Sequence, residues 1–277
     1  MSSNVPRASP ARLSLRALST LLTQPHTTAP IRAQRSHEYD YRYPSTNDPS
    51  GVSGGAHVDM PSWFDGDVDS LGECGVGTVQ RFRAPLGGPG GAGNGIFWYA
   101  FQTGSVTVVT LSSEHASEPE SAQGQWLART LAEVNRSVTP WLVVTQHRHI
   151  YHMSLAEEEV QRGYLANLEP LFMRFKVDLV LMGHTHDIQR TCPIFNWTCT
   201  PGAPVYVTTG ASGALLEGAA GGYGPVPALA STVMFFDGNR TGFSTVAARN
   251  RTHLRLRWIA NADGSVADES WIVKSAL

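Results

Sequence analysis

Three histidines follow short apolar runs, and their side chains are the groups in this chain best suited to bind a metal. His184 and His186 stand one residue apart, after the apolar run at 178–182. His147 follows a second apolar run, PWLVVTQ. Such runs predict buried strands, and α/β sheets place their ligand sites at the carboxyl ends of strands. We therefore expect these three side chains at one edge of a sheet.

Imidazole is a ligand for zinc, iron, manganese or copper, so the three histidines predict a metal site. The alternative interpretation is that they are satisfied polar groups at a sheet edge. His149 and His152 lie nearby in HRHIYH. They are candidates for groups that support the ligands, for phosphate contacts or for exposed loop residues. Asp187 and Arg190 either orient a ligand or are solvated.

The pattern around these residues predicts alternating strands and helices. Gly104 divides a β-hairpin, and Pro170 is expected to kink or end a helix. The predicted elements are a hairpin at 96–113, helices at 121–135 and 157–175, strands at 140–147, 178–182 and 204–213, and antiparallel strands in the tail. This order indicates a mixed α/β sandwich. Residues 44–95, rich in Gly, Pro, Ser and Asp, are expected to be loop.

Composition narrows the classes of partner. The formal net charge of -2 over 277 residues gives no reason to expect nucleic acid or an anionic membrane. No apolar run approaches the roughly 20 residues that a transmembrane helix needs. One large domain or two small ones fit this length.

The cysteines and Asn-x-Ser/Thr patterns suggest a secretory protein. Cys192 and Cys199 are close enough in sequence to close a small loop, leaving Cys74 over; the alternative is three free thiols. Candidate glycosylation sites are Asn135, Asn196, Asn239 and Asn250. The arginine-rich first 37 residues carry no acidic residue and no convincing signal peptide, and resemble a transit peptide or unstructured chain. We expect residues 1–36 to be disordered and unrelated to the rest.

The sequence resembles the purple acid phosphatases, within the calcineurin-like metallophosphoesterases. The stretches that carry the resemblance are SHEYDY, GECGV, YAFQTGSVTVVTLSSEH, WLARTLAEVNRSVTPWLVVTQHRHIYHMS, VDLVLMGHTHDIQRTCPIFN, PVYVTTGASG and THLRLRWIANADGSVADESWIVK. The resemblance covers roughly residues 37–274, so residues 37–277 are expected to be the C-terminal portion of the family's catalytic domain. The implied fold is a four-layer α/β/β/α sandwich, here incomplete.

The resemblance implies a dinuclear centre that hydrolyses phosphomonoesters at acidic pH, with iron paired with zinc, manganese or a second iron. By position, His147 and His184 would bind the divalent metal and His186 the iron. His37 would contact the substrate phosphate, as a catalytic residue. A metal pair orients the phosphoryl group and lowers the pKa of a bound water.

This chain lacks four of the seven ligands that the resemblance implies. It has no Gly-Asp-x-Gly and no Gly-Asp-x-x-Tyr motif, and Ser36 stands where the family has an asparagine ligand. Asp67, in DGDVD, has the wrong neighbours and is interpreted as loop. We therefore expect at most one metal and negligible phosphatase activity.

Three functional interpretations remain open. In the preferred one, the chain is an incomplete copy of an acid phosphatase whose longer form is secreted or vacuolar. In the second, it is a non-catalytic metal- or phosphate-binding remnant, stable alone, as a homodimer or when completed by another chain. In the third, it is a different metallophosphoesterase, such as a phosphodiesterase or nuclease.

Overall fold

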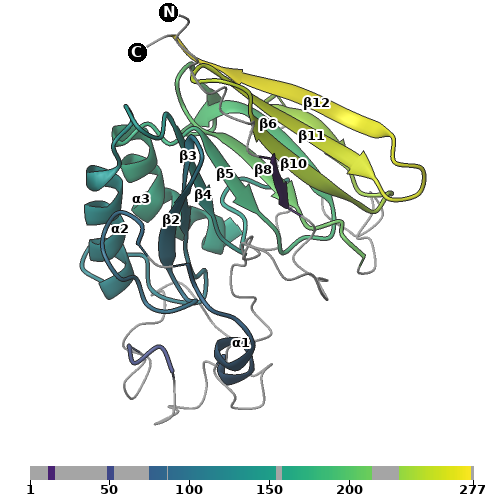
Figure 1. Cartoon of the computed structure of the whole chain (residues 1–277). Helices are drawn as coiled ribbons and strands as arrows, with labels where there is room; N and C mark the ends of the chain where they lie inside the picture. Colours follow the sequence, from purple (N-terminus) through teal and green to yellow (C-terminus); the bar gives the residue numbers. More distant parts are fainter. Residues whose placement is uncertain are drawn as a thin grey trace, which may run out of the picture.

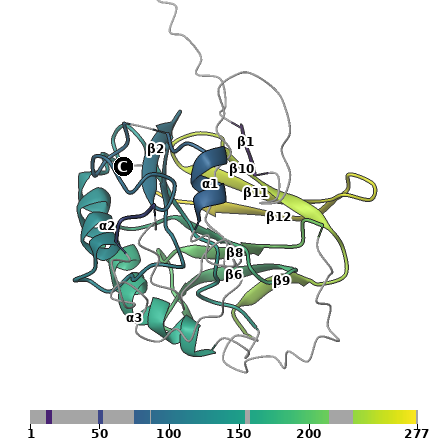
Figure 2. The same cartoon turned by 90° about the horizontal axis from the view of Figure 1, so that it is seen from below.

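The computed structural model describes residues 12–15, 49–52, 75–85, 87–153, 158–213 and 231–275. Figure 1 shows a helical layer, a large central sheet and a smaller second sheet stacked in that order. The view in Figure 2 keeps α2 and α3 on one side of the large sheet and β10 to β12 on the other. These are three of the four layers of the predicted α/β/β/α sandwich, and the α/β fold class is confirmed.

The large sheet is mixed and carries the histidine segments. Its order is β2-β3-β4-β5-β8-β6-β7, with β9 paired to β6. Neighbouring strands from β3 through β4 and β5 to β8 are parallel. The strands are β2 (Tyr99–Thr103), β3 (Val106–Thr110), β4 (Trp141–Thr145), β5 (Leu179–Met182), β6 (Ile188–Phe195), β7 (Thr198–Cys199), β8 (Val205–Thr209) and β9 (Val233–Asp237). The expected hairpin around Gly104 is the β2–β3 pair.

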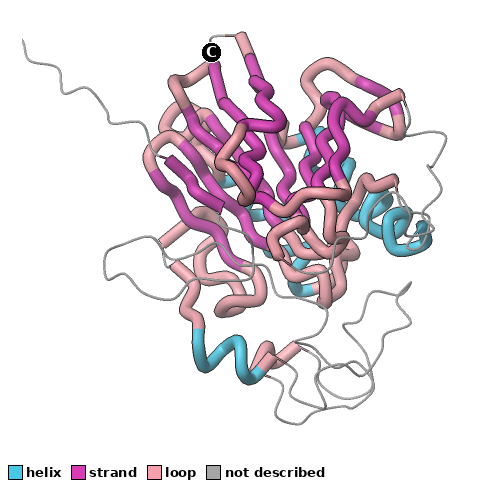
Figure 3. The backbone as a smooth tube through the Cα atoms, turned by 90° about the vertical axis from the view of Figure 1, so that its right-hand side faces the viewer, coloured by secondary structure: helices cyan, strands magenta, loops and turns pink. Residues whose placement is uncertain are grey.

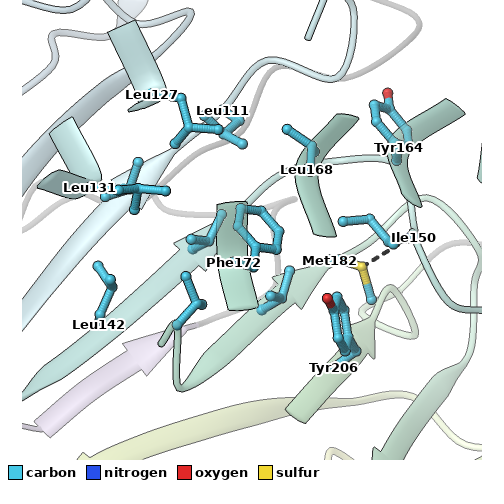
Figure 4. Packing of buried hydrophobic residues seen from close by; sticks show 14 of the residues in the cluster. Leu111, Leu127, Leu131, Leu142, Ile150, Tyr164, Leu168, Phe172, Met182 and Tyr206 are labelled. Atoms are coloured by element: carbon cyan, nitrogen blue, oxygen red, sulfur yellow. Dashed lines mark hydrogen bonds between the residues drawn. The ribbon is translucent and has the colours of Figure 1, made fainter. Parts of the chain in front are cut away.

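Two helices connect the parallel strands and cover one face of the sheet. The helices are α2 (Ala122–Glu133) and α3 (Glu158–Arg174). Ser121 caps α2, because its Oγ accepts a hydrogen bond from the Gly124 N–H at 3.0 Å. Figure 4 shows the core beneath them, where side chains of α2 and α3 meet those of the strands and of Ile150.

The sequence predicted that Pro170 would either kink or end the helix. It does not end α3. The helix continues through this position to Arg174. A proline inside a helix removes one backbone hydrogen bond. Leu168 and Phe172, on either side of it, are buried in the core. Their packing keeps the helical conformation despite the lost bond.

The second sheet packs face to face on the first. Its strands are β1 (Arg12–Leu15), β10 (Gly242–Ala248), β11 (His253–Ala260) and β12 (Val266–Val273), in that order. Alternate residues of β11 are buried, and Leu254, Leu256 and Trp258 pack against side chains of β3, β4 and β5. This inter-sheet core is what the alternating tail sequence predicted.

Two parts of the N-terminal third differ from the sequence-based expectation. Residues 12–15, expected to be disordered, form β1 antiparallel to β10. The rest of segment 1–36 lies outside the described residues. Within the expected loop 44–95, residues Val76–Arg81 form a short helix, α1, after Gly75, whose φ of 78° is in the left-handed region.

The outer face of the second sheet is not covered by any helix in the described part of the chain. Figure 3 looks toward this side of the molecule. Trp271 and Val273 of β12 are 43% and 60% exposed. They share this face with Arg255 and His253 of β11, their register partners. The face would be an inner surface of a complete four-layer sandwich.

Lys274, directly after β12, fastens the C-terminal strand to the large sheet. Its Nζ lies 2.9 Å from Asp178 Oδ1 and 3.8 Å from the centre of the Trp141 ring. Asp178 also accepts from Arg136, at 2.7 Å, and from the Leu142 N–H, at 2.7 Å. These contacts tie the start of β4 and β5 to the end of β12. Among the described helices, none is long and apolar enough to cross a membrane.

Candidate metal centre

The pairing of β4 with β5 brings His147 and His184 together, although 36 residues separate them in the chain. The two strands are parallel, with Thr145 opposite Leu181. The pairing extends beyond the strands, because the Gly183 N–H donates to the His147 carbonyl at 2.9 Å. The candidate site therefore lies at the carboxyl ends of β4 and β5, as the sequence predicted.

His147 and His184 face each other through ring nitrogens. The Nε2 atom of His147 lies 3.3 Å from the Nδ1 atom of His184, and the rings meet edge to face with centres 5.1 Å apart. Two imidazoles bound to one tetrahedral zinc, each at about 2.0–2.1 Å, have their nitrogens about 3.3 Å apart. The two nitrogens thus have the separation of neighbouring ligands on one ion.

His184 holds this position in an unfavourable backbone conformation. Its φ is 73°, in the left-handed region that residues with a Cβ seldom adopt. Such a conformation costs on the order of 1–3 kcal/mol and persists where the surrounding structure enforces it. It is found preferentially at functional sites.

His149 and His152 are buried, which excludes the interpretation that they are exposed loop residues. Their exposed fractions are 0% and 2%. The centre of the His149 ring lies 4.6 Å from that of His152 and 5.7 Å from that of His184, and both ring pairs are tilted. Burial, and then the neighbouring His152 and His184, hold the pKa of His149 well below its usual value. Their contact with a substrate phosphate stays a prediction.

Asp187 is buried and paired, and not solvated. Its carboxylate oxygens lie 2.9 Å and 3.1 Å from His152 Nε2. Because an ionised carboxylate only accepts, Nε2 carries the proton. The Thr185 hydroxyl lies 3.1 Å from the same nitrogen and 3.3 Å from Asp187 Oδ1. Of the alternatives open from the sequence, an orienting role fits Asp187, whereas Arg190 binds Asp268 at 2.7 Å, away from these histidines.

Sequence reasoning missed Glu114 and Gly210. Glu114 is buried and pairs with Arg148, at 3.2 Å, between the two histidines of its segment. Gly210 packs under the histidine loop so closely that a Cβ there would lie 1.8 Å from the Thr185 carbonyl oxygen. Both residues lie in stretches that carry the resemblance, but neither has a metal-ligand spacing of its own. Gly210 follows a predicted strand, and Glu114 follows an apolar run within the polar sequence SSEH.

The remaining predicted residues fall in different places. His186 is half-buried on the same loop as His184. His37 and Cys74 lie outside the described residues. Cys192 and Cys199 form a disulfide across the β6–β7 hairpin. The predicted glycosylation sites are all exposed, and their modification stays a prediction: Asn135, Asn196, Asn239 and Asn250.

The described residues offer His147 and His184 as candidate ligands for a metal ion. The His147–His184 pair has the spacing of two ligands. In the described part of the chain, no group of three or more His, Cys, Asp or Glu side chains is arranged to hold a metal ion. Two carboxylates among the described residues near the histidines are already paired, Asp187 with His152 and Glu114 with Arg148.

Comparison with known proteins identifies the family. Residues 54–187 match the calcineurin-like phosphoesterases, and residues 203–269 match the iron/zinc purple acid phosphatase-like protein C family. Purple acid phosphatase 1 of Ipomoea batatas is 34% identical over 190 residues, 64% of this chain and 39% of that protein. Probable inactive purple acid phosphatase 9 of Arabidopsis thaliana is 30% identical over 256 residues, 87% of this chain and 37% of that protein.

A solved structure agrees with these matches. The purple acid phosphatase PPD1 from yellow lupin (Lupinus luteus) seeds superposes with a TM-score of 0.68 at 27% identity, covering 87% of this chain and 40% of that one. The chain thus spans about two fifths of the length of these relatives. It belongs to the purple acid phosphatases, a family of dinuclear metal enzymes within the calcineurin-like phosphoesterases, and corresponds to their C-terminal part.

Proposed function

We propose that this chain is the C-terminal part of an acid phosphatase-like catalytic domain that binds one divalent metal ion through His147 and His184. The observation that carries the proposal is the 3.3 Å separation of His147 Nε2 and His184 Nδ1. We further propose that the chain by itself does not hydrolyse phosphomonoesters. Zinc is the expected ion, because imidazole ligands suit a borderline cation.

The proposed lack of activity rests on the ligand set. A neutral pair of imidazoles provides no negative charge, so it does not offset the repulsion between two cations a few ångströms apart. Some relatives carry the word inactive in their names, among them the Arabidopsis thaliana protein above. Lack of activity has therefore been assigned, at least by name, to other proteins of this family.

The roles of the residues follow from their positions. His147 and His184 would hold the ion, and the left-handed backbone at His184 keeps its Nδ1 directed at His147. A bound divalent ion would supply Lewis acidity toward a phosphoryl oxygen. His149, buried beside both ligands, excludes water from behind the rings. Phosphate recognition would therefore depend on the ion and on residues beyond this cluster.

The test is metal content and turnover of one preparation. After dialysis against zinc, elemental analysis should find one ion per chain, and p-nitrophenyl phosphate should not be hydrolysed at acidic pH above the rate in a protein-free control. His184→Ala should reduce zinc affinity by about 100-fold or more, because one of two ligands is lost. His253→Ala, a histidine on β11 away from the site, is the matched control and should leave zinc binding unchanged.

Two ions per chain with zinc-dependent turnover that His184→Ala abolishes would overturn the proposed inactivity. Hydrolysis of bis(p-nitrophenyl) phosphate but not of the monoester would instead favour a phosphodiesterase. Zinc binding that His184→Ala leaves unaltered would show that the ion binds elsewhere.

A further inference from the structure

The two segments that supply His147 and His184 are joined by a second, buried polar contact. His152 belongs to the segment that follows β4, and Asp187 to the loop that follows β5. Their side chains meet at 2.9 Å. Both are nearly excluded from solvent, with exposed fractions of 2% and 4%. A charge-assisted hydrogen bond at this depth is among the stronger side-chain contacts available to a protein.

We propose that Asp187 and His152 are a positioning pair that sets the separation of His147 and His184. This inference rests on the proposed function, since it concerns the same metal site. Neither residue needs to touch the ion. The pair acts as a clamp, fixing the His184–Thr185–His186 loop against the HRHIYH segment, so that the ligand nitrogens are held at metal-binding distance before the ion arrives.

Contacts on both sides of the pair support a positioning role. The Asp187 carbonyl accepts from the N–H groups of Gly210 and Ala211, at 3.0 Å and 3.1 Å, which fixes the loop to the end of β8. On the other side, His152 packs against His149, and His149 packs against His184. A continuous series of packed rings therefore leads from the clamp to the ligand.

Thr185 strengthens the link, because it lies between the two histidines of the loop. Its hydroxyl is directed to the His152–Asp187 contact. The Thr185 hydroxyl and the His184 imidazole thus have separate partners. If the clamp is removed, the loop loses its side-chain anchor, whereas the backbone bond from Gly183 to His147 remains. The expected result is a looser site and not an unfolded one.

The experiment measures metal affinity and stability in parallel. Asp187→Ala should weaken binding of Co²⁺ and Zn²⁺ by about 10–100-fold, the range seen when groups that orient metal ligands are removed. Asp187→Asn, which keeps an oxygen that can accept from His152, should recover part of the affinity. The absorption bands of Co²⁺ should shift in Asp187→Ala, because they report the geometry of the ligands around the ion.

Asp268→Ala is the matched control. Asp268 belongs to another half-buried ion pair, with Arg190 at 2.7 Å, and contacts none of the site histidines. Both alanine variants should lose thermal stability in the metal-free state, but only Asp187→Ala should lose affinity and alter the cobalt spectrum. If Asp187→Ala does not fold, His152→Gln and Asp187→Asn provide the same comparison.

The outcomes separate the two proposals. Wild-type protein that binds no Co²⁺ or Zn²⁺ would overturn the proposed function and this inference with it. Wild-type binding with unchanged affinity and cobalt spectrum in Asp187→Ala, or in the two milder variants, would overturn the positioning role alone. Equal losses of affinity in Asp187→Ala and Asp268→Ala would also overturn it, because general destabilisation would then account for the effect.

Discussion

Single residues at the site combine a strained backbone with close packing. His184 keeps a positive φ, and beneath the next residue Gly210 leaves no room for a methyl group. The histidines were predictable, because their spacing after apolar runs is a recognisable metal pattern. Gly210 and the Asp187–His152 contact were not, since they depend on which side chains the strands bring together. A local sequence pattern predicts which residue types are candidate ligands, but it does not predict which side chains pack around them.

Gly210→Ala should displace the histidine loop and weaken zinc binding. The added Cβ would lie 1.8 Å from the Thr185 carbonyl oxygen, so the backbone between the two histidines has to move. Overpacking of this kind costs about 1–3 kcal/mol of folding stability. The check is zinc affinity by calorimetry together with thermal unfolding.

Gly93→Ala is the control for that change. Its Cβ would lie 1.9 Å from the Trp98 carbonyl oxygen, a similar conflict in a turn that carries none of the site histidines. It should reduce stability and leave zinc affinity intact. A Gly210→Ala protein that binds zinc as tightly as Gly93→Ala would contradict the prediction.

Three elements meet at Glu169 of α3, behind the histidine segment. The Tyr151 hydroxyl donates to its carboxylate, as does the Asn196 N–H of the disulfide hairpin, at 3.0 Å. The Trp197 ring packs edge to face on Tyr151. The sequence predicted α3, the disulfide and the strand ends correctly, because each has a local signature. It could not predict their meeting point, since Glu169 resembles any polar residue of an amphipathic helix.

Glu169 should make stability depend on pH. Burial raises the pKa of this carboxyl above its usual value, and the hydrogen bonds from Tyr151 and Asn196 only partly oppose that shift. The folded state therefore holds the proton more tightly than the unfolded state. Its contribution to stability is full below the ordinary glutamate pKa and is lost as pH rises through the raised value.

Glu169→Gln removes this titration while keeping an oxygen that accepts from Tyr151. Thermal unfolding between about pH 4 and pH 7 should show a weaker fall in stability with rising pH in the variant than in wild type. Glu133→Gln, at the exposed end of α2, should leave the wild-type profile unchanged. Superimposable profiles for wild type and Glu169→Gln would contradict the assignment.

On the scale of the whole molecule, the second sheet presents an open edge, beside which Trp271 and Val273 are exposed. Only β11 pairs with β12 among the described strands, so the other side of β12 offers unpaired backbone groups. An exposed edge next to apolar side chains is a site for association between chains. The class of fold followed from the resemblance, but the face of the second sheet that no described helix covers is known only from the structure.

Val273→Lys should reduce concentration-dependent association of the protein. A lysine on the edge strand opposes edge-to-edge pairing by charge and by its hydration. Light scattering across a dilution series measures the effect. Val138→Lys is the control, because Val138 is 59% exposed, against 60% for Val273, but lies in the turn before β4. If both lysine variants reduce association equally, net charge accounts for the change. That result would contradict the prediction that chains associate through the β12 edge.

The parallel arrangement of β4 and β5 also bears on inheritance. Both proposed ligands, the helix between their strands and the clamp that aligns them come from one uninterrupted stretch of chain, from Trp141 to Asp187. Any segment of a gene that encodes this stretch therefore carries all the residues that would place the two imidazoles, whatever sequence precedes it.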